Sequence, residues 1–151
     1  MVDATAELER ASADIVLTRD AREILDRAAK AAAARGAVHV TAADVFNATL
    51  QLPGNLADRE IRALGFDPKA IAPLIQANGA DASSPSLRQL LVNANREAQV
   101  LGHYQVDSIH LLLALMYSDA RATSVALQKA GMTLYDLRRH MQTGVGADVP
   151  V

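Results

Sequence analysis

Hydroxyl and basic side chains near two predicted helix starts are the residues of this sequence best suited to bind a ligand. Thr18 and Ser84 each precede a helical pattern, where a hydroxyl can cap the helix and the free backbone N–H groups can bind a phosphate or carboxylate. Arg19, Arg22 and Arg88 lie close to these positions and could form a cationic rim around such an anion. Plain helix capping and a solvated helix face are the alternatives.

Tyr104 is a candidate of a different kind. It follows the helix-ending residue Gly102 and should therefore lie on a turn. An exposed tyrosine at this position could anchor a bound peptide, and packing of its ring between the two halves of the protein is the alternative. The complete set of predicted peptide-binding residues is Thr18, Arg19, Arg22, Ser84, Arg88 and Tyr104.

No sequence pattern predicts catalysis or a resident metal. Cysteine is absent, and the histidines are not spaced three or four apart. The P-loop that binds nucleotide phosphates is missing, as are the GxSxG and HExxH patterns of hydrolases. We therefore expect a protein that is not an enzyme, with no catalytic residue, no metal and no cofactor. His110, near the start of a predicted helix, is expected to be structural.

Helices must position these residues, because the composition favours them. Half of the 151 residues are hydrophobic, Ala, Leu and Val supply most of these, and runs of β-branched residues are absent. The net charge is −2 and charges of both signs are interspersed, which argues against nucleic-acid binding. No apolar stretch approaches the roughly 20 residues that span a membrane. With no cysteine and no signal peptide at the start, we expect a cytoplasmic protein that binds no membrane.

A spacing of 66 residues relates the first half of the sequence to the second half without a gap. Residue identity or hydrophobic class is kept at many of the paired positions, and an internal repeat of this kind is typical of duplicated helical units. Examples are Gly36 with Gly102, Gly65 with Gly131, Ile24 with Leu90, and Ile61 with Leu127.

The repeat predicts an all-α fold of two tandem four-helix repeats, related by pseudo-two-fold symmetry around a shared core. The first repeat is expected to cover residues 17–79 and the second 83–144, so that the domain spans 17–144. Residues 1–16 form an N-terminal extension with a short helix, and 145–151 form a tail or a linker. From capping residues, glycines and prolines, the expected helices cover about 7–15, 18–35, 42–52, 56–64, 67–78, 84–101, 108–117, 121–130 and 133–144.

Four segments of the sequence resemble a known family. They are Leu17 to Ala21, Arg96 to His103, Val106 to Leu115 and Ala126 to Gly131. These segments are similar to the N-terminal repeat of the Clp ATP-driven unfoldases, and the resemblance covers about residues 17–143. It implies an all-α domain that recruits adaptor proteins and substrates for unfolding.

Some members of that family bind phosphorylated arginine at two symmetric pockets. The resemblance implies that the capping hydroxyls of Thr18 and Ser84 correspond to residues beside the phosphate. The glutamates that bind the guanidinium in those members align here with Ala43 and Ile109. Because a guanidinium without a carboxylate loses a charge-assisted hydrogen bond worth about 1.5–3 kcal/mol, this departure argues against phosphoarginine binding.

The sequence thus predicts a protein-binding domain of the Clp unfoldase type, with unfolded or tagged substrate proteins, adaptors and a Clp ATPase as partners. Two alternatives remain. The chain could be a stand-alone protein of the same fold that acts as an adaptor, a decoy or a sink for small molecules. It could also be a helical regulator that binds nucleic acid.

Overall fold

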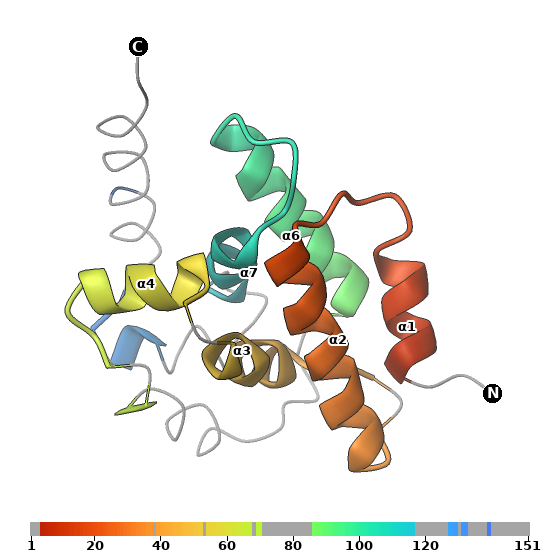
Figure 1. Cartoon of the computed structure of the whole chain (residues 1–151). Coiled ribbons are helices and arrows are strands. Elements are labelled where there is room, and N and C mark those ends of the chain that lie inside the picture. The colour runs from red at the N-terminus through yellow and green to blue at the C-terminus, as the bar shows by residue number, and fades with distance from the viewer. Residues whose placement is uncertain are drawn as a thin grey trace.

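The computed structural model describes residues 4–37, 39–52, 54–67, 69–70, 86–116, 127–129, 131–132 and 139. Among these residues, six α-helices have defined bounds, positions 69–70, 127–129 and 139 are also helical, and there is no strand, which confirms the all-α prediction (Figure 1). The helices are α1 (Ala4–Ala11), α2 (Arg19–Ala34), α3 (Ala42–Gln51), α4 (Leu56–Ala63), α6 (Leu87–Val100) and α7 (Ser108–Leu115). Ser84, the linker at 80–83, most of the last two predicted helices and the tail at 145–151 lie outside the described residues.

Hydroxyl and carboxyl side chains cap the helices largely where the sequence predicts them. Thr18 caps α2 by accepting a hydrogen bond from the Ala21 amide, and Asp107 caps α7. Thr41 and Asp44 form a capping box at the start of α3, because each side chain bonds the backbone N–H of the other. The caps at Thr41 and Asp107 therefore fix where α3 and α7 begin after the preceding loops.

The first helix of the second half begins later than predicted. Ser86, not Ser84, caps α6, since the Ser86 hydroxyl accepts a hydrogen bond from the Gln89 amide at 3.0 Å. The first residue of α6, Leu87, is 1% exposed and is also the first of the buried residues along one face of this helix. The prediction that Ser84 caps this helix is therefore wrong.

The short N-terminal helix is also displaced from its predicted range of 7–15. α1 begins at Ala4 and ends at Ala11. Just beyond it, the Ser12 hydroxyl donates to the Leu8 carbonyl at 2.8 Å, a local bond that competes with continuation of a helix. Residues 12–17 then run as a connection to α2.

One hydrophobic core joins elements from both halves of the chain. Every residue of α7 is buried, and α7 contacts α2, α3, α4 and α6 (Figure 1). Phe46 of α3 and Leu112 of α7 are fully buried members of this core. Because α7 is largely apolar on all sides and wholly buried, it lies at the centre of the described helices.

Helix ends show the same geometry at the predicted spacing. Gly36 and Gly102 follow the ends of α2 and α6 with φ near +78° and +79°, a left-handed conformation that glycine adopts without steric cost. In both halves of the chain, the amide of the residue after the helix-ending glycine donates a hydrogen bond to the carbonyl five residues earlier. These bonds run from Ala37 to Ala32 and from His103 to Ala98, and likewise from Phe66 to Ile61 and from Met132 to Leu127.

Candidate functional site

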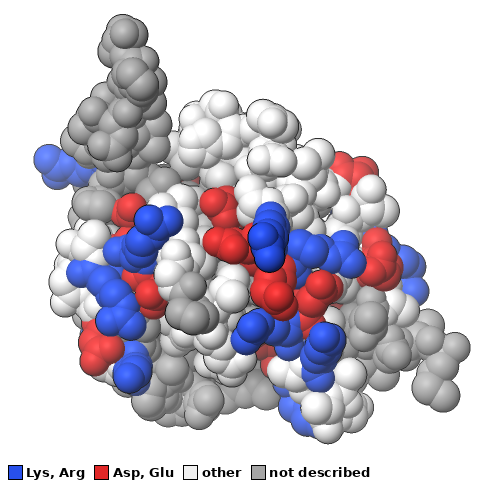
Figure 2. Space-filling view, in the orientation of Figure 1, with Lys and Arg blue, Asp and Glu red and all other residues white. Residues whose placement is uncertain are grey.

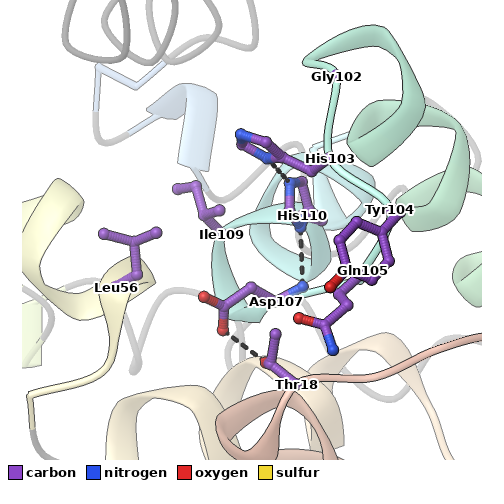
Figure 3. Close-up of a pocket in the computed structure, with 9 residues that line it drawn as sticks. All are labelled: Thr18, Leu56, Gly102, His103, Tyr104, Gln105, Asp107, Ile109 and His110. Atoms are coloured by element: carbon purple, nitrogen blue, oxygen red, sulfur yellow. Dashed lines mark hydrogen bonds between the residues drawn. The ribbon is translucent and has the colours of Figure 1, made fainter. Parts of the chain in front are cut away.

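A pocket of about 320 Å³ opens where the starts of α2, α4 and α7 meet the loop at 102–107 (Figure 3). Its walls are mostly apolar, with polar groups at the two helix starts. The lining residues are Thr18, Leu56, Gly102, His103, Tyr104, Gln105, Asp107, Ile109 and His110. Two of the predicted site residues, Thr18 and Tyr104, therefore come together here from opposite halves of the sequence.

Backbone pairing places Thr18 at the pocket. The Thr18 amide donates to the Val106 carbonyl at 2.9 Å, and the Val106 amide donates to the Val16 carbonyl at 2.8 Å. These bonds form an isolated parallel bridge between Leu17 and Val106. The segment before α2 is thus tied to the segment before α7, and the two helix starts face one pocket.

The capping groups of α2 and α7 are bonded to each other. The Thr18 hydroxyl donates to Asp107 Oδ1 at 2.8 Å while accepting from the Ala21 amide. The same carboxylate oxygen accepts from the Ser108 amide at 2.7 Å. A phosphate at the start of α2 would therefore meet the negative charge of Asp107. Together with Ile109, which lines the pocket without a charge, this geometry argues against an anion as the ligand.

Two histidines form a hydrogen-bonded pair beside the pocket (Figure 3). His103 Nδ1 and His110 Nε2 are 3.0 Å apart, and the rings meet edge to face. The Asp107 amide donates to His110 Nδ1 at 2.8 Å as part of the capping box of α7. Because this nitrogen accepts, neutral His110 carries its proton on Nε2 and donates it to His103. The neutral His103 ring then holds its own proton on Nε2.

Burial keeps His110 neutral. The residue is 2% exposed, and desolvation, reinforced by the neighbouring His103, lowers its pKa to about 4. The charges of Asp107 and Glu97 act in the opposite direction but are the weaker influences. The expectation of a structural role for His110 agrees with this position at the cap of α7.

Tyr104 and Ile109 supply contact area at the pocket. The Tyr104 side chain is 81% exposed and stands at the rim, so the alternative in which it packs between the two halves does not hold (Figure 3). Ile109 and Leu56 lie on the opposite side of the pocket in this view. An exposed aromatic ring beside an apolar hollow is an arrangement that suits binding of a side chain from another protein.

The three predicted arginines do not line this pocket, and Ser84 lies outside the described residues. Arg19 is exposed on the first turn of α2. Arg22 is 2.9 Å from Glu9 and 3.3 Å from Asp26 in ion pairs. Arg88 binds Asp14 and the carbonyl of Ala11. These arginines therefore do not form a cationic rim at the Thr18 pocket.

The histidine pair and the Thr18–Asp107 bond escape reasoning from helical spacing alone. His103 and His110 are seven residues apart and on different elements, so a search at intervals of three or four does not pair them. A signal is nevertheless present. His103 is the second residue beyond the cap of α6, and His110 is the third residue of α7, so a short loop brings them to the same end of two packed helices.

These features define a helical domain with a hollow at the junction of its helix starts. Residues 82–149 match the family model described as the Clp repeat (R) N-terminal domain. This part of the chain, which contains α6, α7 and most of the loop side of the pocket, is similar to that family. The resemblance to the Clp N-terminal repeat is thereby confirmed for residues 82–149, a match consistent with a Clp-type N-terminal domain, a class associated with protein interaction.

Proposed function

We propose that the chain recruits substrate proteins or adaptors to a Clp unfoldase through the pocket beside Thr18 and Tyr104. The observation that carries this proposal is an 81% exposed tyrosine at the edge of a mostly apolar pocket, in a chain that matches the Clp N-terminal family. The pocket offers hydrogen-bonding groups and apolar walls, which suit an extended peptide better than a phosphate.

The proposal includes a role in binding without chemistry, in the cytoplasm. On the face shown in Figure 2, acidic and basic side chains are intermixed, which favours protein partners over nucleic acid. Among the described helices, none has both the length and the apolar character needed to cross a membrane. We infer no catalytic residue, because the polar groups of the pocket already bond each other and act as caps.

We further propose that residues 17–79 and 83–144 are two copies of one unit. The recurrence of the helix-end hydrogen bonds 66 residues apart supports this, as does the packing of α2 on α3 and of α6 on α7. At a spacing of 66 residues, α2 and α6 end at equivalent positions and differ by two residues at their starts, whereas α3 and α7 start at equivalent positions and differ by two residues at their ends.

The test is binding of fluorescein-labelled casein, an unfolded client, followed by fluorescence anisotropy. Tyr104→Ala should weaken binding about tenfold, or about 1.4 kcal/mol, because it removes the exposed aromatic ring at the rim of the pocket. Val100→Ala is the matched control, since Val100 is 67% exposed on α6 but does not line the pocket. No saturable binding by the wild-type chain, or an equal loss for both variants, would contradict the proposal.

A further inference from the structure

Helix α1 covers a surface made by both halves of the chain. It packs against α2 and α6 at the end of the molecule away from α4 (Figure 1). Its apolar contribution is small, because Leu8 and Ala11 are the core residues it provides. We refer to the surface beneath it, edged by Arg22, His39 and Arg88, as the α2–α6 surface.

Two arginines at equivalent positions of the predicted repeats bind carboxylates of the N-terminal segment. Arg22 Nη2 lies 2.9 Å from Glu9 Oε1. Arg88 makes a two-pronged contact with Asp14, at 2.6 and 3.1 Å, and also donates to the Ala11 carbonyl at 3.0 Å. The Arg88 hydrogen bond lowers the pKa of Asp14. Two of the three arginines that the sequence offers as an anion-binding rim are thus occupied by the chain's own acidic residues.

Glu7 adds a third acidic contact. Its carboxylate accepts a hydrogen bond from the Val40 amide at 2.7 Å, and its other oxygen lies 2.8 Å from His39 Nδ1. The Glu7 side chain is 16% exposed, so these bonds are partly shielded from water. In the second half, the amide of Val106, which corresponds to Val40, is instead bonded by the backbone carbonyl of Val16. The Glu7 side chain therefore supplies the acceptor for the Val40 amide, whereas in the second half a backbone carbonyl supplies the acceptor for the equivalent Val106 amide.

The fit of α1 on this surface is incomplete. A cavity of about 410 Å³ lies between α1 and the start of α6, lined by Glu7, Arg10, Ala11, Ser86 and Arg88. An eight-residue helix is too short to be stable alone, since isolated helices below about 12–15 residues are marginal in water. α1 is therefore held by docking, and few buried apolar contacts oppose its release.

We propose that the α2–α6 surface binds acidic amphipathic helical segments of partner proteins, and that α1 is a tethered occupant that competes with them. The charge complementarity of Glu7, Glu9 and Asp14 with the basic edge defines the partner: a short helix with leucine on one face and carboxylates beside it. The inference extends the proposed protein-binding function to a second surface and does not use the pocket beside Tyr104.

The connection between α1 and α2 determines how high the concentration of a partner must be to displace α1. Residues 12–16 join α1 to the bridge at Leu17, so α1 samples the surface at an effective concentration on the order of millimolar. A free peptide of equal intrinsic affinity must exceed that concentration to displace it. Weakening the docking of α1 should therefore strengthen binding in trans, which is the opposite of the usual effect of a destabilising substitution.

The experiment measures anisotropy of a fluorescein-labelled peptide of residues 1–16 added to the full chain. The Leu8→Asp chain should bind this peptide at least about tenfold more tightly than the wild-type chain, because its own α1 no longer fills the surface. A second chain, Glu9→Gln with Asp14→Asn, weakens α1 without changing its apolar face and should act in the same direction. Circular dichroism confirms that each chain is folded.

Charge reversal tests the partner class. In the Leu8→Asp background, Arg88→Glu should abolish binding of the wild-type peptide, and a peptide with Asp14→Lys should recover it. Arg59→Glu, an exposed change on α4, is the control and should leave binding unchanged. If the folded Leu8→Asp chain binds no more tightly than wild type, or if a peptide with lysine at positions 7, 9 and 14 binds it equally well, the inference is overturned.

Tyr104→Ala separates this inference from the proposed function. It should leave binding of the 1–16 peptide unchanged while it weakens binding of casein. Loss of peptide binding with casein binding retained would remove only the α2–α6 proposal. If Tyr104→Ala leaves casein binding unchanged while the 1–16 peptide binds the Leu8→Asp chain as expected, only the proposal for the pocket is removed.

Discussion

At the level of single residues, Asp107 connects two helix caps, the pocket and the histidine pair. Its carboxylate caps α7, accepts the Thr18 hydroxyl that caps α2, and lies at the pocket, while its backbone amide fixes the tautomer of His110. The two hydrogen bonds are linked in series: the Asp107 amide donates to His110, and His110 in turn donates to His103. A second proton on His103 Nδ1 would break the contact between the rings, and a second proton on His110 Nδ1 would break the hydrogen bond from the Asp107 amide, because in each case both facing nitrogens would be donors.

The buried histidine predicts a pH-dependent stability. The folded-state pKa of His110, about 4, lies below the ordinary value of 6.5, so the unfolded chain binds this proton first as the pH falls. The contribution is present above pH 6.5 and is lost progressively between pH 6.5 and 4. The free energy of unfolding should therefore fall by about 2 kcal/mol between pH 7 and pH 5 from this residue.

The measurement is urea denaturation at both pH values for the wild-type chain and for His110→Asn. Asparagine keeps a side-chain acceptor for the Asp107 amide but does not titrate, so the variant should lose less stability on acidification. His103, Asp107 and Glu97 also face this site and are unchanged in the variant. Identical pH dependence in the two chains would show that His110 is already solvated.

The start of α6 gives a prediction at the level of the secondary-structure element. Ser86→Ala removes the hydroxyl that accepts from the Gln89 amide and should lower the free energy of unfolding by about 1 kcal/mol. Ser84→Ala is the matched control and should have a smaller effect, because the cap lies two residues later. Urea denaturation at pH 7 compares them. If Ser84→Ala lowers the free energy of unfolding more than Ser86→Ala does, Ser84 is the helix cap, as the sequence first indicates.

Elements follow from the sequence wherever a local chemical signal is unambiguous. Thr41 with Asp44, and Gly36 after an alanine-rich stripe, specify a helix start and a helix end without help from the rest of the chain. The start of α6 does not, because Ser84 and Ser86 are both good caps and the choice falls to burial of Leu87. The attachment of α1 is beyond local signals altogether, since it depends on contacts such as Asp14 with Arg88 across 74 residues.

The whole molecule is organised around α7, whose side chains fill the space between helices from both halves. The Ser108 hydroxyl at its start also accepts from the Ala57 amide of α4 at 3.0 Å, a buried bond between the halves. Neither half could bury its apolar face alone with this arrangement. The two proposed repeats should therefore fold and unfold together, although each has its own caps and helix ends.

This coupling can be measured because the three tyrosines all lie after residue 100, so tyrosine fluorescence reports on the second half while far-ultraviolet circular dichroism reports on all helices. Leu112→Ala in the second half should lower the free energy of unfolding by about 2–5 kcal/mol, and Phe46→Leu in the first half should lower it by a smaller amount, because both residues are fully buried but leucine keeps most of the apolar volume of phenylalanine. In urea, both probes should shift together for both variants. Lys30→Ala, an exposed change on α2, should leave the midpoint nearly unchanged. If Phe46→Leu moves the circular dichroism transition but leaves the tyrosine transition in place, the halves unfold independently, and the shared core does not hold the molecule together as one cooperative unit.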